Sequence, residues 1–304
     1  MLEIHASSVR APDGTELTAF ECGGGPGPTF VLCNGLGGNI DAWRYLIDDF
    51  GPHHRIVSWD YRGLYKSGPA APGTGYDVET QVQDLRAVLQ HFGIQKAVLL
   101  GWSMGVQVSF EAWRQMPEIV QGMVLINGTY GSPLATAFSP MLKDSPLAQM
   151  LPAIAKAMES VAHLAEPFQP MAQRVTKTKM ALKIVKNLGL ASQALDEKMF
   201  LTLASEVAGL HMPRYMATLN ALAAHSALEV LPSITVPVMV VTGDHDMLTP
   251  LAQSREMVKA IAGAELLVIP SGTHYTPLEF PELIHLRVEK WLRERFGFTR
   301  PFDR

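Results

Sequence analysis

Short apolar segments alternate with helix-length segments over most of this chain, and this alternation limits the fold more than any other feature. Apolar runs typical of buried strands occur at 29–33, 54–60, 96–100, 120–127, 235–243 and 264–270. Segments with helical character follow several of them, at 78–93, 104–116, 250–263 and 281–297. Apolar strands that alternate with helices are typical of a parallel sheet covered on both faces. The sequence therefore predicts an α/β fold with a mostly parallel, doubly wound sheet, preceded by an N-terminal hairpin over 3–22.

The alternation stops between about residues 132 and 232. No strand-like run occurs there, and prolines divide the segment into helix-length pieces. We therefore expect a core formed by 1–131 and 233–304, with a helical cap, 132–232, inserted after the sixth strand. Both junctions fall at the carboxyl edge of the sheet, where open sheets bind ligands, so the cap is expected to control access to the site. Its predicted apolar underside contains Phe138, Phe168, Phe200 and eight of the fifteen methionines: Met141, Met150, Met158, Met171, Met180, Met199, Met212 and Met216. The alternative is that these methionines only pack the cap helices on one another.

The sequence GWSMG sets Ser103 between two glycines directly after an apolar strand. A tight strand-to-helix turn would explain the glycines, and so would a strained turn that exposes a nucleophilic serine. A nucleophilic serine needs a base and an acid that orients the base. His274, in the loop after the last strand, is the predicted base, and Asp246, after the preceding strand, is the predicted acid. Asp244 is expected to complete the turn, and Asn127, which ends another strand, cannot supply a negative charge.

An acyl-transfer site also needs donors for the oxyanion. The backbone N–H of Met104, at the start of a helix, is one predicted donor, and that of Leu36, in the glycine-rich loop after the strand at 29–33, is the other. Asn34, Gly35 and Trp102 flank these positions and are predicted to contact substrate.

Four motifs in this order resemble those of the α/β-hydrolase fold. They are GWSMG at the nucleophile elbow, GDHDMLTP at the acid loop, GTHYTPLEFPE at the histidine loop and WDYRGLYKSG at a structural D-x-R-G loop. The resemblance covers nearly the whole chain and implies an esterase- or lipase-like serine hydrolase. Asn34 departs from it, because relatives often carry histidine there. Tyr65 stands where glycine is usual and is interpreted as a local packing change without catalytic meaning.

A serine at the elbow argues against the haloalkane dehalogenases and epoxide hydrolases of this fold, which use aspartate there. The predicted activity is hydrolysis of carboxylic esters with small to medium apolar acyl groups through an acyl-enzyme, without a metal or organic cofactor. A carbon–carbon bond hydrolase, a lactonase or a cofactor-free perhydrolase would use the same residues. A non-catalytic ligand-binding protein is the remaining alternative, although all three residue types of the triad are present.

Composition limits the partners and the location. A net charge of -4 gives no reason to expect nucleic acid, so the expected partner is a small apolar ester, and the oligomeric state is left open. The N-terminus lacks the pattern of a secretory signal, and the apolar runs are far shorter than the ~18 residues of a membrane span. Together with only two cysteines, these features predict a cytoplasmic protein. The segment 174–186 carries five cations and no acid; it is interpreted as a solvated helix face, with attraction to an anionic interface or substrate as the alternative.

Overall fold

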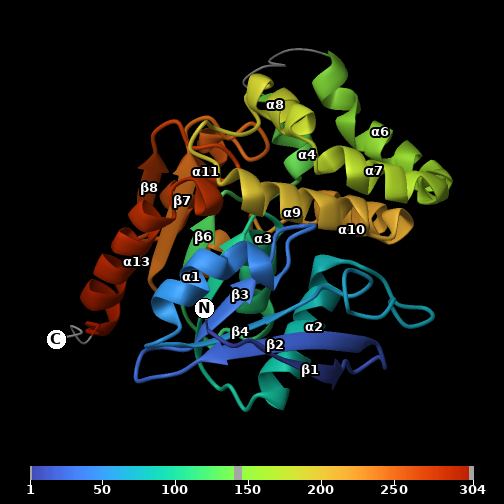
Figure 1. Ribbon diagram of the computed structural model, residues 1–304. Coiled ribbons are helices and arrows are strands. Elements are labelled where there is room, and N and C mark those ends of the chain that lie inside the picture. The colour runs from blue at the N-terminus through green and yellow to red at the C-terminus, as the bar shows by residue number, and fades with distance from the viewer. Residues whose placement is uncertain (1, 140–145, 301–304) are drawn as a thin grey trace.

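A computed structural model describes residues 2–139 and 146–300, and its central element is an eight-stranded sheet (Figure 1). The strand order is β1-β2-β4-β3-β5-β6-β7-β8. Strand β2 runs antiparallel to β1 and β4, and the pairs from β4 to β8 are parallel. The strands are β1 (His5–Arg10), β2 (Glu16–Gly23), β3 (Phe30–Cys33), β4 (Arg55–Trp59), β5 (Ala97–Trp102), β6 (Val120–Ile126), β7 (Val238–Gly243) and β8 (Glu265–Ile269). The predicted fold class and the N-terminal hairpin are confirmed.

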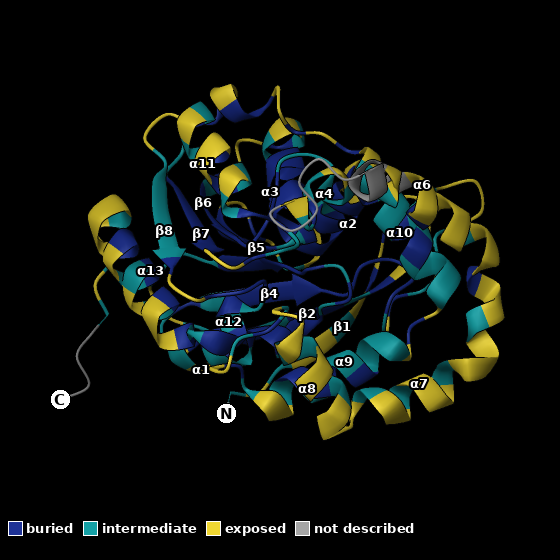
Figure 2. Ribbon diagram, turned by 90° about the horizontal axis from the view of Figure 1, so that it is seen from above, coloured by how far each residue is buried: buried dark blue, intermediate teal, exposed yellow. Residues whose placement is uncertain are grey.

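Helices cover both faces of the sheet. One face packs against α1 (Arg44–Phe50) and α13 (Pro281–Phe296), and the other against α2 (Val78–His91), α3 (Met104–Gln115) and α11 (Leu251–Ala260). Successive strand residues point to opposite faces, so Val31 belongs to one core and Phe30 to the other. Both cores need apolar residues, which explains why the central strands are apolar throughout (Figure 2).

The segment between β6 and β7 is helical and lies above the sheet in Figure 1. Two of its helices, α9 (Glu197–Ala208) and α10 (Met212–Ala224), form an inner layer together with the short α4 (Pro133–Thr136). An outer layer packs on them: α6 (Pro146–Val161) contacts α10 and α4, α7 (Gln169–Thr176) contacts α9, and α8 (Lys179–Asn187) contacts α7. The remaining short helices are η1 (Ile40–Trp43), η2 (Ala162–Phe168), η3 (Leu231–Ser233) and α12 (Thr276–Glu279).

The parallel strands end at one edge of the sheet, beneath this helical segment. The loops after β3, β5, β6, β7 and β8 therefore come together, and these loops contain the residues singled out from the sequence. Among the residues that the structure describes, no helix combines the length and the apolar character needed to cross a membrane.

Candidate active site

Ser103 joins β5 to α3 in a strained turn. Its φ of 55° and ψ of -115° lie outside the regions that L-residues prefer, and the turn is held by a hydrogen bond from the Ser103 N–H to the Ile126 carbonyl at 2.9 Å. A Cβ at Gly101 would overlap the Gly105 carbonyl oxygen, and one at Gly105 would overlap the Cys33 carbonyl oxygen. Both glycines are thus required, because the start of α3 lies directly against the ends of β5 and β3.

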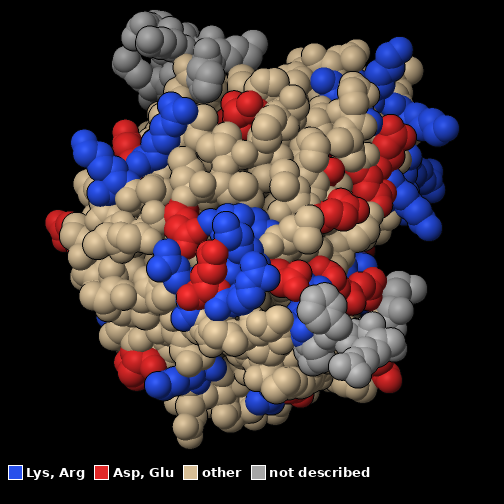
Figure 3. All heavy atoms as spheres, turned by 90° about the vertical axis from the view of Figure 1, so that its left-hand side faces the viewer, with Lys and Arg blue, Asp and Glu red and all other residues tan. Residues whose placement is uncertain are grey.

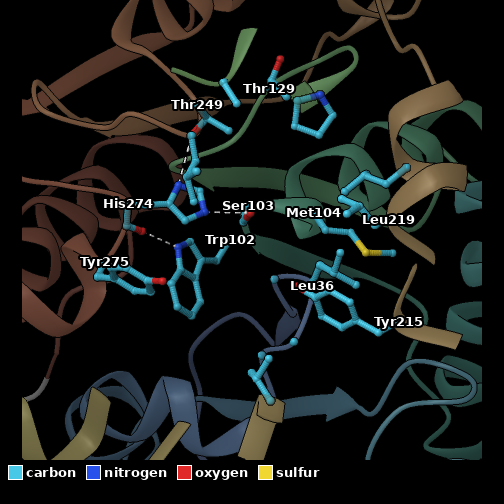
Figure 4. A pocket seen from close by; sticks show the side chains of 18 of the residues that line it. Leu36, Trp102, Ser103, Met104, Thr129, Tyr215, Leu219, Thr249, His274 and Tyr275 are labelled. Atoms are coloured by element: carbon cyan, nitrogen blue, oxygen red, sulfur yellow. Dashed lines mark hydrogen bonds between the residues drawn. The ribbon is translucent and has the colours of Figure 1, made fainter. Parts of the chain in front are cut away.

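Ser103, His274 and Asp246 form one hydrogen-bonded chain. His274 Nε2 lies 2.9 Å from Ser103 Oγ (Figure 4). On the other side of the ring, His274 Nδ1 lies 2.9 Å from Asp246 Oδ2. An ionised Asp246 can only accept, so Nδ1 carries the proton and Nε2 is free to accept one from the serine hydroxyl. The order and spacing match the arrangement in which a serine is activated for attack on a carbonyl.

Protein donors surround the Asp246 carboxylate. Oδ1 accepts from the N–H groups of Leu248 and Thr249 at 2.8 and 2.9 Å, and Oδ2 accepts from the Thr249 hydroxyl at 2.7 Å and from Asn127 Nδ2 at 2.8 Å. Burial alone would raise the pKa of Asp246. The charge and hydrogen bond of His274, with the Thr249 and Asn127 donors, outweigh burial and lower the pKa below its usual value. Asp246 therefore stays ionised beside the imidazole.

The loop that carries His274 is fixed from two sides. Trp102 Nε1 donates to the His274 carbonyl at 3.0 Å, and the Glu279 carboxylate accepts from the Thr273 N–H and hydroxyl, each at 2.8 Å. Glu279 also accepts from the Ser192 N–H at 2.7 Å, which ties the loop to the helical segment above it.

The glycine-rich loop after β3 approaches Ser103 closely. A Cβ at Gly35 would lie 3.3 Å from Ser103 Cβ, and a hydrogen bond from the Gly38 N–H to the Gly35 carbonyl at 2.9 Å closes a turn around Leu36. Among the described residues, the N–H groups of Leu36 and Met104 have no acceptor within the protein. Both residues line the pocket beside Ser103, so their amides are available to a ligand oxygen.

Asn34 does not contact the pocket, and its predicted role as a substrate contact is wrong. Its side chain is fully buried and points into the core, where Nδ2 donates to the Trp59 carbonyl at 2.7 Å and Oδ1 accepts from Trp43 Nε1 at 2.9 Å. The Asn34 carbonyl accepts from the Tyr61 hydroxyl at 2.7 Å. Asn34 thus fixes the base of the loop, whereas its neighbour Gly35, and Trp102, do lie in the pocket wall.

A cavity of about 380 Å³ opens above Ser103 and is lined mainly by apolar side chains. Figure 4 shows Ser103 between His274 on one side and Leu219 and Tyr215 of α10 on the other. The wall contributed by the helical segment consists of Pro133, Leu134, Ala137, Phe200, Leu203, Ala204, Val207, Tyr215, Leu219 and Leu222.

The predicted methionine-rich underside is therefore wrong for the described residues; Met141 lies outside them. None of the seven methionines that the structure describes in this segment lines the cavity, and four of them are more than half exposed: Met150, Met158, Met171 and Met180. Of the three phenylalanines, Phe200 alone lines the cavity, while Phe168 is exposed. Met150, Met158, Met171 and Met180 lie on the outer helices, and Met199, Met212 and Met216 lie on the inner ones. The side chains of the inner helices that reach the cavity are mainly leucine, with alanine, valine and two aromatic residues.

Three residues that matter here were not predicted. Asn127 and Thr249 hold Asp246, and Tyr65 donates from its hydroxyl to the Gly37 carbonyl, next to Leu36. The interpretation of Tyr65 as mere packing is thus incomplete. The one available sequence signal was the threonine three residues after Asp246, because an aspartate often binds the amides two and three residues on.

One group of potential metal ligands lies outside this site. Among the described residues, Glu79, Glu111 and His225 hold ligand atoms within 4.8 Å of one another. The Glu111 carboxylate already accepts from Arg114 and Gln115, each at 2.8 Å, so protein donors occupy it.

Comparison with known proteins identifies the family of this fold. The family model described as alpha/beta hydrolase fold matches residues 28–281.

Protein ABHD8 of Bos taurus is 24% identical over 85% of this chain and 54% of its own length, so this chain spans about half of that relative. Epoxide hydrolase 3 of Xenopus tropicalis is 24% identical over 88% of this chain and 72% of its own length. The esterase EaEST of Exiguobacterium antarcticum superposes with a TM-score of 0.71 at 21% identity, over 95% of this chain and 100% of its own. Because the family model spans most of the sequence, this chain belongs to the alpha/beta hydrolase fold family, a family of hydrolase enzymes.

Proposed function

We propose that this protein hydrolyses carboxylic esters of small to medium apolar acyl groups through an acyl-enzyme on Ser103. The observation that carries the proposal is the hydrogen-bonded chain from Ser103 through His274 to Asp246 at the base of an apolar cavity. The cavity wall favours an apolar acyl group, and the two unpaired amides beside Ser103 favour a substrate with a carbonyl oxygen.

In the first half of the reaction, Ser103 Oγ attacks the ester carbonyl carbon and its proton passes to His274 Nε2. The carbonyl oxygen gains the negative charge and accepts hydrogen bonds from the Leu36 and Met104 N–H groups. The dipole of α3, whose N-terminus is at Met104, adds favourable potential there. Collapse of this intermediate breaks the ester C–O bond, and His274 donates the proton to the leaving alcohol. Asp246 stabilises the imidazolium while it exists.

In the second half, water replaces the alcohol. His274 Nε2 takes a proton from the water, whose oxygen attacks the acyl carbon and forms a second oxyanion in the same place. Collapse releases the carboxylic acid and returns the proton to Ser103 Oγ. Every proton moves between groups within hydrogen-bond reach of His274.

The helical segment 132–232 acts in this proposal as a cap on a core formed by 1–131 and 233–304. Its inner helices supply the wall opposite His274, so the cap determines the acyl group that fits. The serine at the elbow favours acyl transfer over the chemistry named for the epoxide hydrolase relative, since the family resemblance implies an aspartate at that position in epoxide hydrolases.

The test is hydrolysis of p-nitrophenyl acyl esters, compared with lactones and ring-cleavage dienoates as substrates. We expect activity on the esters, loss of about three or more powers of ten in kcat for Ser103→Ala, and labelling of Ser103 by a fluorophosphonate. Ser109→Ala is a matched control, because the Ser109 hydroxyl is bonded to the Gly105 carbonyl and lies outside the cavity. A dienoate or lactone with a much higher kcat/KM than any ester would refute the ester assignment, and an unlabelled Ser103 in folded protein would refute the nucleophile.

A further inference from the structure

The outer helices of the segment between β6 and β7 expose an unusual amount of apolar surface. In the part of the chain that the structure describes, fourteen large hydrophobic side chains are exposed, and eleven of them lie between residues 150 and 188. We call these eleven the outer apolar set: Met150, Ile154, Met158, Val161, Leu164, Phe168, Met171, Val175, Met180, Ile184 and Leu188. Isolated exposed apolar residues are normal, but their concentration in one segment marks an interaction surface.

Their spacing places them in stripes along successive helices. Met150, Ile154 and Met158 recur every four residues along α6, and Met180, Ile184 and Leu188 do so along α8 and its C-cap. Residues four apart share one helix face. Figure 2 shows that α7 and α8 are largely exposed. The outer helices therefore turn apolar stripes to the solvent, the reverse of the pattern in a helix that only covers a core.

The outer apolar set does not take part in the cavity described above. No member of it lines that cavity, to which the helical segment contributes residues of α4, α9 and α10 and of the turn after α4. Of the outer helices, α6 and α7 pack on the inner ones and α8 packs on α7. Among the described residues between 150 and 188, the buried ones are Ala155, Ala162 and Leu182. The apolar stripes thus neither fill the core nor line the cavity.

Cations accompany the stripes. Lys156, Arg174, Lys177, Lys179 and Lys183 are exposed on the same helices, in a chain whose net charge is -4. The sixth cation, Lys186, is bound to Glu197 at 2.8 Å. Figure 3 shows Lys and Arg side chains gathered at its upper right, on the side where Figures 1 and 2 place α7 and α8. The two acids between residues 150 and 190 are Glu159, which accepts from Asn220 at 2.6 Å, and Glu166, which lies 3.2 Å from His211.

We propose that this surface, the outer apolar set with its five exposed cations, binds an anionic phospholipid surface peripherally. Helices that carry aliphatic and aromatic residues beside lysines and arginines lie in the plane of a membrane interface, with the apolar side chains in the acyl boundary and the cations at the headgroups. The long lysine side chains can place their ammonium groups among phosphates while their methylene groups stay with the apolar stripe. A second copy of the chain fits this surface less well, because a symmetric contact would oppose two sets of five cations.

The proposal is tested by co-sedimentation of the full chain with vesicles, a readout that does not depend on ester hydrolysis. One set of vesicles is phosphatidylcholine alone, and the other is an equal mixture with phosphatidylglycerol. We expect tight binding to the mixed vesicles at low salt, weaker binding at high salt because exposed charges are screened, and the weakest binding to phosphatidylcholine alone.

Two triple variants separate the charged from the apolar contribution. Lys177→Gln with Lys179→Gln and Lys183→Gln should weaken binding to mixed vesicles about a hundredfold, at ~1 kcal/mol for each cation. Phe168→Ser with Met171→Ser and Met180→Ser should weaken it about a hundredfold or more on both kinds of vesicle. The matched control is Leu283→Ser with Leu286→Ser, two exposed leucines of α13, which should bind as the wild type does. Unchanged thermal melting of each variant shows that it is folded.

Two outcomes overturn the proposal. Vesicle binding that is absent, or equal in the wild type and both triple variants, excludes this surface as the lipid contact. Sedimentation velocity without lipid tests whether a second copy of the chain binds this surface instead. If the wild type is a dimer and the triple variant at Phe168, Met171 and Met180 is a monomer, the surface is a dimer interface. Failure of ester hydrolysis would leave the binding results unaffected, so the two proposals fail separately.

Discussion

Asn127 and Asp246 follow the neighbouring parallel strands β6 and β7, and the Asn127 amide donates to the Asp246 carboxylate at 2.8 Å and to the Thr273 carbonyl at 3.0 Å. Asn127 adopts a left-handed conformation, with φ at 45°, which asparagine tolerates better than most residues. It thereby connects the loop of the acid to the loop of His274. We infer that Asn127 positions both residues, although it touches neither Ser103 nor the cavity.

Asn127→Asp should lower kcat/KM by about tenfold to a hundredfold. The substitution removes the amide that donates to the buried Asp246 carboxylate and places a second carboxylate beside it. The added negative charge favours the imidazolium form of His274, so the acid limb of the pH–rate profile should move to higher pH. The control is Asn220→Asp, since Asn220 also donates to a carboxylate, that of Glu159, but outside the site. Equal losses in the two variants, with no movement of the acid limb, would assign Asn127 a purely structural role.

The sheet and the positions of the candidate catalytic residues could be predicted because both follow from local patterns. Parallel strands buried on both faces must be apolar throughout, and their carboxyl ends must meet at one edge. Ser103, Asp246 and His274 each follow a predicted strand, so they could be assigned to loops at that edge. The two glycines beside Ser103 indicated a tight strand-to-helix turn. A larger residue at either position would overlap the backbone where the start of α3 lies against β3 and β5.

The hydrogen-bond partners of these residues and the orientation of the helices between β6 and β7 could not be predicted. Asn34 follows β3 directly, as a substrate contact would, and only the surrounding Trp43 and Trp59 turn its amide inward. Amphipathic spacing identifies an apolar helix face but not the neighbour that this face meets. The methionines of α6, α7 and α8 were therefore expected to face the cavity, although α9 and α10 occupy the space between these helices and Ser103.

Tyr65→Phe should lower kcat by up to about tenfold with little change in KM, because it removes one hydrogen bond to the loop that carries the Leu36 amide. Tyr65 holds a strained φ of 50° in this arrangement, which indicates that the contact outweighs the strain. Tyr76→Phe is the control, since the Tyr76 hydroxyl accepts from the Ala70 N–H at 3.3 Å, away from that loop. A variant that melts earlier but keeps its kcat would show that Tyr65 only packs.

Asp60→Asn should remove a pH-dependent loss of stability. Burial, opposed by the Lys66 N–H and charge, raises the pKa of Asp60 to about 7, and its Oδ1 has no partner among the described residues. Between about pH 4 and about pH 7, Asp60 is protonated in the folded state and ionised in the unfolded state. Its contribution to the free energy of unfolding therefore falls as the pH rises through this range. Three pKa units correspond to an upper bound of about 4 kcal/mol.

The measurement is urea unfolding of both proteins at about pH 5 and about pH 8. Asparagine keeps an oxygen that can accept from the Lys66 N–H, so the variant should gain stability relative to the wild type at the higher pH and much less at the lower one. Other titrating groups are common to both proteins and cancel in the difference. A difference that stays constant with pH would show that the carboxyl group does not titrate in this range.

Side chains of the inner helices should determine the acyl chain length, and exposed methionines of the outer helices should not. Leu219→Ala enlarges the cavity opposite His274, where an acyl chain would end, and each additional buried methylene contributes about 0.8 kcal/mol. We therefore expect the ratio of kcat/KM for p-nitrophenyl octanoate to that for the butyrate to rise about tenfold or more. Met180→Ala is the control, because Met180 belongs to the same helical segment but is 74% exposed and lines no part of the cavity. Its ratio should equal that of the wild type. If Met180→Ala shifts the ratio as far as Leu219→Ala does, the acyl group does not occupy the cavity above Ser103.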